Sequence, residues 1–351
     1  MDHYPAVSAN EASPVYFNTI NIIREEKTMR HGLIFAAALA IAGYAAPNAM
    51  AAEKVTILGG GVKGQPYQFA VGLSKILKDK GGIDATPQSA KGMVAQARIL
   101  AKGGAEFAWG LGGPIGAWAY KGTRRFEKEG PKKNLRAVLA YPFGSFHWLT
   151  LSDSGINSVK DFKGKRISVG SASSTTQTFG RFFFEAHGLK KGDYKELTPG
   201  FSGGFGALRD KSVDAHLTMG LPPMSAVQEI TAVRKVRIVD MDKSAVDSVL
   251  KKYGPGLQVS SIAPGAYGDN QVNKQAVNTM SMFFGFSTAD SVSADVVYKV
   301  TKVLFENLGE FHGTAKAAKS VTLAGVCTGL SLPLHEGAKR YYKEKGVAGC
   351  K

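Results

Sequence analysis

Residues 55–77 read VTILGGGVKGQPYQFAVGLSKIL and carry the clearest structural signal in the chain. The first four, of which only Thr56 is polar, predict a buried strand. Three glycines follow, and Pro66 then suits the first turn of a helix whose apolar residues share one face. A strand, a glycine-rich loop and a helix in this order predict a βα unit.

The glycines at 59, 61 and 64 also match the dinucleotide fingerprint G-x-G-x-x-G, and Asp84 stands where a ribose-binding acid is expected. Two features oppose that interpretation. Pro66 lacks an N–H group and restricts Gln65 away from helical geometry, so the helix must begin after Gly64 rather than within the motif. Asp84 also stands early in its strand. We favour an anion- or carboxylate-binding loop and keep the dinucleotide site as the alternative.

The alternation of strands and helices continues along the chain. Further strands are predicted at 83–88, 107–110, 135–143, 147–152, 167–170, 195–198, 213–219 and 236–239. Helices are predicted at 66–78, 93–102, 159–162, 294–308, 314–323 and 335–345, and from a Ser/Thr loop to residue 187. An extended run at 257–262 can form a return crossing. The pattern predicts an α/β fold of two lobes with central, mostly parallel sheets and a cleft between them.

Three loops rich in glycine or hydroxyl groups fall at predicted carboxyl ends of strands, where open parallel sheets bind ligands. They lie at 59–64, 171–176 and 220–223. In the second loop, SASSTT, one residue suffices to cap the next helix. Six small or hydroxylated residues exceed that need, which favours ligand contact. Tyr67, on the first helical turn, either closes over a ligand or packs in the core.

Residues 29–51 have the form of a secretory signal peptide. The basic start MRH at 29–31 precedes an uncharged apolar run at 33–46, and AMA at 49–51 offers a small-x-small cleavage site. The apolar run is too short for a membrane span. We expect cleavage after Ala51 and export to the periplasm. Residues 1–28 are interpreted as an upstream extension, with translation beginning at Met29.

The predicted mature chain, residues 52–351, is basic. Residues 1–51 hold 3 of the 44 basic and 4 of the 28 acidic side chains, which leaves 41 and 24 and a net charge of +17. This charge favours an anionic partner, while scattered lysines and export disfavour nucleic acid. Cys327 and Cys350 both lie near the C-terminus. In an oxidising compartment we expect them to form a disulfide, with two free thiols as the alternative.

No constellation of catalytic or metal-binding residues is evident in the sequence. The patterns HExxH and CxxC and a paired-acid motif are absent. His147 and His216 fall within predicted strands, where a core histidine is the simpler interpretation. Ser174 has no general base that the sequence places beside it. We therefore predict that the chain is not an enzyme and uses no cofactor or metal.

Four blocks of the mature chain resemble the TAXI family of solute-binding proteins, the receptors of a class of TRAP transporters. They are residues 57–77, 135–176, 296–311 and 330–347. The segment SVKDFKGKRISVG at 158–170 is shared with many type II periplasmic binding proteins, so the C-terminal blocks discriminate better. The resemblance implies a type II periplasmic-binding-protein fold in which two crossing strands join lobe 1 (52–147 and 263–351) to lobe 2 (148–262).

The resemblance also implies a function. Family ligands are small organic anions such as dicarboxylates, 2-oxoacids or glutamate, and the closed receptor delivers them to a TRAP-type membrane permease. Carried over to this chain, the ligand loops and nearby positions give the candidate residues Gly60, Gly61, Val62, Lys63, Gly64, Tyr67, Lys91, Gly112, Ser171, Ser173, Ser174, Thr175, Thr176, Gly220, Leu221 and Pro222.

The chain departs from the family pattern at three places. Lys63 and residues 65–67 (QPY) replace a Thr and a Tyr-Tyr pair, and Gln96 replaces an Asn. Residues 111–113 (LGG) replace a polar residue after the third strand, which removes side-chain donors and adds room. A larger or less polar carboxylate than glutamate is our hypothesis, with Lys63 and Lys91 as sources of charge. The alternatives are a binding protein of an ABC importer and a secreted nicotinamide-dependent oxidoreductase that uses 59–64.

Overall fold

A computed structural model describes residues 53–62, 64–172 and 174–350. The chain divides into the units Met1–Ala51 and Ala52–Lys351, and the second unit is described below. The predicted upstream extension and signal peptide, together with the candidate site residues Lys63 and Ser173, lie outside the described residues. Within the described part, no helix is long and apolar enough to cross a membrane.

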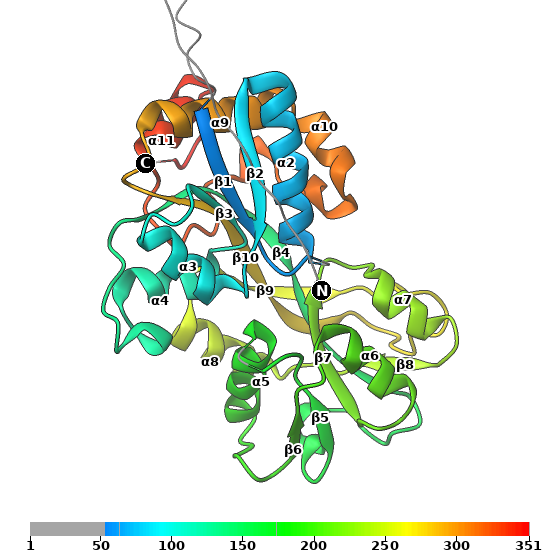
Figure 1. Cartoon of the computed structure of the whole chain (residues 1–351). Coiled ribbons are helices and arrows are strands. Elements are labelled where there is room, and N and C mark those ends of the chain that lie inside the picture. Colours follow the sequence, from blue (N-terminus) through cyan, green and yellow to red (C-terminus); the bar gives the residue numbers. More distant parts are fainter. Residues whose placement is uncertain (1–52, 63, 173, 351) are drawn as a thin grey trace, which may run out of the picture. The chain divides into compact units, whose positions relative to one another are not determined.

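One mixed sheet forms the centre of the second unit (Figure 1). Its strands are β1 (Glu53–Gly59), β2 (Ile83–Ser89), β3 (Phe107–Trp109), β4 (Leu135–Leu151), β5 (Arg166–Ser168), β6 (Lys195–Leu197), β7 (Ala215–Gly220), β8 (Val236–Ile238), β9 (Leu257–Ile262) and β10 (Val277–Ala289). The order along the sheet is β2-β1-β3-β10-β4-β7-β5-β6, with β8 beside β4 and β9 beside β10.

The helices follow the strands in the order expected of βα units. They are α2 (Gln65–Gly81), α3 (Met93–Ala101), α4 (Gly113–Lys121), α5 (Thr175–Ala186), α6 (Phe201–Arg209), α7 (Ser225–Thr231), α8 (Lys243–Tyr253), α9 (Ala294–Glu306), α10 (Leu308–Thr314) and α11 (Glu336–Glu344). Short 3₁₀ turns lie at η1 (Arg124–Phe126), η2 (Val159–Phe162), η3 (Lys316–Ser320) and η4 (Leu323–Gly325).

Two parallel groups of strands share the sheet. In the first group β1 pairs in parallel with β2 and β3, and in the second group β5 pairs in parallel with β6 and β7. The long strands β4 and β10 run antiparallel to each other and connect the groups, because β10 pairs with β3 and β4 pairs with β7. Figure 1 shows the first group above, the second below and the two long strands between them.

The register along β4 and β10 sets the two groups face to face. The last residue of β3, Trp109, pairs with Phe286, and the last residue of β7, Gly220, pairs with Ser145, which pairs with Ser281. The strands of the two groups point toward each other, so both sets of carboxyl ends face the same interval. Five residue steps along β10 separate these registers, or roughly 16 Å at ~3.3 Å per residue.

The α/β class, the βα order and two crossing strands expected from the sequence are confirmed, with three corrections. The sheet is mixed rather than mostly parallel, because every pairing of β4 and β10 is antiparallel. The strands expected at 135–143 and 147–152 are one strand, β4, since Gly144 continues the extended chain. The crossing expected at 257–262 is β9, which only pairs with the amino half of β10, and β10 itself was not anticipated.

The segment 314–323 was also predicted wrongly. It is not one helix, because α10 ends at Thr314 and the 3₁₀ turn η3 follows. Ala315 between them has an extended backbone, with φ −161° and ψ 144°. The division at 147 and 262 into two lobes remains a prediction.

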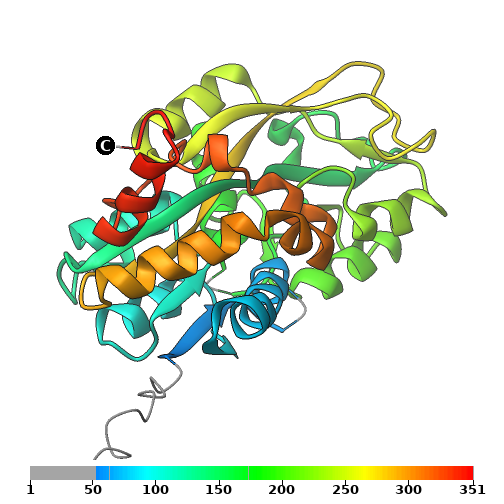
Figure 2. The ribbon, with the colours of Figure 1, turned by 90° about the horizontal axis from the view of Figure 1, so that it is seen from above.

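Helices α2, α9 and α11 cover one part of the sheet. Helix α9 contacts both α2 and α11, and Figure 2 shows it lying between them. Ser293 caps α9 by accepting a hydrogen bond from the Val296 amide at 3.2 Å, and the buried Val297, Val300 and Leu304 recur at helical spacing. The C-terminal segment is tied down by a disulfide between Cys327 and Cys350, whose Cα atoms are 5.4 Å apart.

Aromatic packing joins the helix after β3 to the helices of the second group. The ring of Trp118 on α4 lies 6.2 Å from Phe179 and 6.0 Å from Phe182 on α5, and 6.4 Å from Tyr253 at the end of α8. The Arg125 guanidinium donates to the hydroxyl of Thr178 on α5 at 2.9 Å. The two groups of strands are therefore held together by side-chain contacts as well as by β4 and β10.

Gly144 is the position in β4 where a side chain is least tolerable. Its φ is +148°, and a Cβ added there would lie 2.1 Å from the carbonyl carbon of Gly220. We predict that Gly144→Ala lowers the free energy of unfolding by roughly 2–4 kcal/mol, because the β4–β7 pairing must shift. Urea unfolding of residues 52–351, followed by circular dichroism, measures the change.

Gly155→Ala is the matched control, since Gly155 also has a positive φ of +75° but no atom within 4 Å of the added Cβ. We expect it to cost only about 1 kcal/mol, from backbone conformation alone. Equal losses in the two variants would contradict the close contact at Gly144.

Candidate functional site

The strand order creates two topological switch points. In the first group β1 lies between β2 and β3, and in the second group β5 lies between β6 and β7. Ligands of open α/β sheets bind beyond the carboxyl end of the strand at which the order reverses. The loop 60–64 follows β1 directly, and the stretch 171–176 is separated from the end of β5 by two residues and runs into α5. The two stretches singled out in the sequence therefore occupy the corresponding place in the two groups, on facing edges.

The loop after β1 has a fixed base and an exposed tip. The Gly64 amide donates to the Gly61 carbonyl at 2.7 Å, and the Ser89 hydroxyl donates to the Gly60 carbonyl at 3.0 Å. A Cβ at Gly59 would lie 2.4 Å from the Cα of Tyr67, so glycine is needed for the helix to approach the strand. Tyr67 is half-buried on the first turn of α2, and Val62 at the tip is 62% exposed.

The same geometry argues against a dinucleotide fingerprint. Helix α2 begins at Gln65 with Gly64 as its N-cap, as the position of Pro66 predicts, so the helix does not start within the motif. Asp84 pairs with Lys54 near the amino end of β2. An acid that binds a ribose would have to lie at the opposite end of that strand, beside the glycine loop.

Gln96 on α3 fastens the ends of β1 and β3 together. Its buried side-chain Nε2 donates to the carbonyls of Gly59 at 2.9 Å and Trp109 at 2.8 Å. Two carbonyl partners fix the orientation of the amide, because only the NH₂ group can donate to both. The sequence singled out Gln96 only as a departure from a family pattern. Its role could not be predicted, since Gly59 and Trp109 are distant from it along the chain.

In the loop after β5, some hydroxyl groups stabilise the fold and others are exposed at the surface. Ser174 caps α5, since its Oγ accepts from the Gln177 amide at 3.1 Å and contacts the Thr176 hydroxyl at 2.9 Å. The capping interpretation therefore holds for Ser174. Ser171 is exposed, and Thr175 and Thr176 are half-buried, which leaves part of the loop open to a solute.

The remaining candidates lie at the same edges in different settings. Leu221 and Pro222 are half-buried after β7, and Lys91 is exposed after β2. Gly112 after β3 is buried, and a Cβ there would lie 2.5 Å from the amide nitrogen of Gly285 on β10. The cavity beside it has a volume of about 10 Å³, the size of one water. The room expected at residues 111–113 is thus absent at Gly112, whose lack of a side chain serves close packing.

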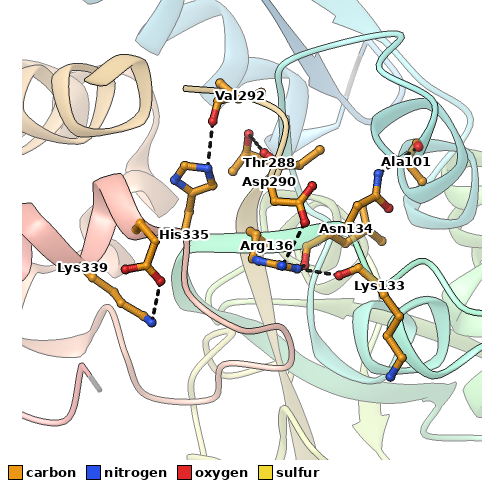
Figure 3. A network of polar contacts seen from close by, with 12 residues as sticks. Ala101, Lys133, Asn134, Arg136, Thr288, Asp290, Val292, His335 and Lys339 are labelled. Atoms are coloured by element: carbon orange, nitrogen blue, oxygen red, sulfur yellow. Dashed lines mark hydrogen bonds and ion pairs between the residues drawn. The ribbon is translucent and has the colours of Figure 1, made fainter. Parts of the chain in front are cut away.

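A second polar network lies at the opposite end of the first group (Figure 3). Arg136 near the start of β4 pairs with Asp290 just after β10 at 2.9 Å, and Asn134 donates to the Ala101 carbonyl at 3.0 Å. His335 accepts from the Gly337 amide through Nδ1, so its Nε2–H donates to the Val292 carbonyl at 3.0 Å. The contact of His335 joins the C-terminal segment to the residues after β10, and the other two connect segments around the start of β4. All of them lie far from the facing carboxyl ends.

The two strand histidines are core residues, as the sequence suggested. His147 Nδ1 lies 2.9 Å from the Ser145 carbonyl and must donate to it, so Nε2 accepts from the Tyr267 hydroxyl at 2.7 Å. His216 Nδ1 lies 2.9 Å from the Ser168 hydroxyl. Neither side chain is exposed, and burial lowers the pKa of each imidazole from its usual 6.5 to about 4.

These buried histidines predict a loss of stability in mild acid. Between pH 6.5 and 4 the unfolded chain binds protons at His147 and His216 that the folded chain does not. The free energy of unfolding is therefore undiminished above pH 6.5 and falls as the pH drops toward 4, by about 3 kcal/mol for each histidine. Urea unfolding at pH 7.0, 6.0 and 5.0 measures the slope. In His147→Gln the slope should be shallower, and an unchanged slope would contradict this assignment.

Distant structural similarities extend over most of the chain. A putative L-cystine ABC transporter protein from Listeria monocytogenes is 18% identical, with a TM-score of 0.43, over 80% of this chain and 99% of that one. The GluR0 ligand-binding core from Nostoc punctiforme, in complex with L-glutamate, is 13% identical, with a TM-score of 0.41, over 74% and 96%.

A third structure is a substrate-binding protein of an ABC uptake transporter from Streptococcus pneumoniae with bound histidine. It is 15% identical, with a TM-score of 0.41, over 75% of this chain and 91% of that one. A family model covers the chain more directly, because it matches residues 57–346, from the first strand to the last helix. The chain belongs to the NMT1-like family.

Proposed function

We propose that the chain is an extracytoplasmic solute-binding receptor that captures a small organic anion between its two groups of strands. The proposal rests on one observation: the two topological switch points face each other. Loops rich in glycine or hydroxyl groups follow β1 and β5, and the register along β4 and β10 directs both toward one interval of roughly 16 Å. An interval of this width suits a small solute held from both sides.

The chemistry of the loops favours an anion. Helices α2 and α5 start immediately beyond them, and the partial positive charge at the N-terminal end of a helix attracts anions. The structure describes every residue in the first turns of both helices, and none of these residues is Asp or Glu. The exposed hydroxyl of Ser171 adds a neutral donor, and the net charge of +17 on residues 52–351 draws anions to the surface.

The receptor then works by binding and delivery. A ligand that contacts both loops favours the form in which they are close, and closure excludes water from the anion. The signal-like segment at 29–51 supports export to the periplasm, and the resemblance of the C-terminal blocks to TAXI receptors supports a TRAP-type permease as the partner. A receptor of an ABC importer is the second candidate. Uptake that requires ATP hydrolysis would favour that candidate over a TRAP-type permease.

Thermal unfolding of residues 52–351 with a panel of solutes tests the proposal. The panel contains organic carboxylates, NAD and uncharged sugars. A carboxylate present at about 100 times its Kd should add roughly 2.7 kcal/mol to the free energy of unfolding. A shift with carboxylates and none with sugars or NAD is expected. Stabilisation by NAD alone would overturn the receptor and restore the dinucleotide alternative.

Ser171→Asp tests whether the loop after β5 contacts the anion. Ser171 is exposed and does not cap α5, so the fold should tolerate the change. We predict that the added charge weakens binding of the stabilising carboxylate at least about tenfold, which is 1.4 kcal/mol. Ser244→Asp, also exposed and in the first turn of α8, is the matched control and should leave the affinity unchanged. Equal affinities in the two variants would remove this loop from the site.

A further inference from the structure

Phe201 is the aromatic side chain that stands out at the surface. It is 52% exposed, and among the described residues it is the only Phe, Tyr or Trp classed as exposed. Single exposed apolar residues are common on soluble proteins and need no explanation by themselves. The position of Phe201 in the fold therefore decides whether its exposure has a use.

That position is beside the loop after β5. Phe201 is the first residue of α6, which follows β6, the neighbour of β5 at the switch point. Ser171 and Pro199 form an isolated antiparallel β-bridge, and the Gly200 amide donates to the Gly170 carbonyl at 3.2 Å. Gly200 has a φ of +87°, a conformation that glycine adopts readily, and it turns the chain directly into α6.

The ring of Phe201 packs against side chains of the protein interior. It lies 5.1 Å from the ring of Phe205 in an edge-to-face arrangement, and Phe205 lies 4.7 Å from the imidazole of the buried His216. Phe205 itself is 7% exposed. Phe201 is therefore packed on one side and open on the other, an arrangement that holds an aromatic contact surface ready before any partner binds.

The facing loop offers a matching apolar side chain. Val62, at the tip of the loop after β1, is 62% exposed, and that loop belongs to the opposite set of carboxyl ends. The hydroxyl and amide groups of both loops suit a carboxylate, whereas Phe201 and Val62 can bury only apolar atoms. A short dicarboxylate such as succinate has only two methylene groups between its charged ends, and these offer little apolar surface to either side chain.

We propose that Phe201 binds the apolar part of the solute, so that the receptor selects monocarboxylates with an aryl or alkyl group over short dicarboxylates and amino acids. This inference rests on the proposed function, since it assigns a ligand class to the same site. Phe201 acts as a specificity-determining residue: it covers the hydrophobic body of the solute, while the loop groups hold the carboxylate.

Binding of defined probes to residues 52–351 tests the inference. The first set is benzoate, phenylacetate and octanoate, and the second is succinate, 2-oxoglutarate and L-glutamate. Thermal unfolding identifies which probes bind, and calorimetric titration gives their Kd values. We expect the first set to bind more tightly than the second. In Phe201→Ala the Kd of the best aryl or alkyl carboxylate should rise at least about tenfold, the effect expected when an aromatic anchor is truncated.

Two further variants separate the role of the ring from general effects. Phe201→Leu keeps apolar area and should recover part of the affinity for octanoate. Val233→Ala removes another exposed apolar side chain, 65% exposed and located between α7 and β8, and should bind every probe as the parent chain does. Because Phe201 is half in solvent, circular dichroism should show the same fold in all variants.

The outcomes distinguish failure of the proposed ligand class from failure of the proposed receptor function. If the second set binds, the first does not, and Phe201→Ala changes nothing, the ligand class proposed here is wrong while the anion receptor stands. If aryl or alkyl carboxylates bind Phe201→Ala as tightly as the parent chain, Phe201 has no role in selection. If no carboxylate of either set binds, the proposed function fails and the inference fails with it.

Discussion

The antiparallel pairing of β4 with β10 is the constraint on which the rest of the fold depends. Residues 135–145 of β4 pair with 281–289 of β10. The other edge of β10 pairs with β3 at residues 286–288, and the later part of β4 pairs with β7 at residues 145–149. Irregularities in the pairing lie between Met282 and Phe283 and between Phe286 and Ser287. This single ladder determines the direction in which the short strands point and the interval that separates their carboxyl ends.

The candidate site follows from that ladder rather than from any one motif. Each group has its first strand in the middle, so a crevice opens beyond β1 and another beyond β5. Small residues allow the close approaches that the arrangement needs, notably Gly59 beneath Tyr67 and Gly144 beside Gly220. Gln96 then fixes the ends of β1 and β3 from the buried side. In the proposed receptor these loops contact the solute, while the hydrogen bonds of Gln96 hold the strand ends from which the first loop starts.

Charged and aromatic residues stabilise different parts of the fold. The ion pair between Arg136 and Asp290 lies away from the facing edges and joins the start of β4 to the end of β10. Buried aromatic residues around Trp118 join α4 to α5 and α8 across the two groups. Against this background the exposed ring of Phe201 is unusual, because it lies beside the loop proposed to hold the anion.

The sequence by itself determined the local elements and the positions of the loops. Apolar runs such as Val55–Leu58 predicted strands, and Pro66 located the start of α2 to within one residue because it suits a first helical turn. The glycine and hydroxyl loops stood out by composition alone. The histidines at 147 and 216 could be assigned to the core from their place in strands.

The tertiary structure alone decided how these parts meet. Strand β10 was missed because its residues, NTMSMFFGFSTA at 278–289, lack strict alternation and are buried on both faces between β3 and β4. The joining of residues 135–151 into one strand required Gly144 to continue it, and only the partner strands show that it does. Strand pairing and the contacts of Gln96 and Phe201 connect residues far apart in the sequence, and local patterns carry no information about such partners.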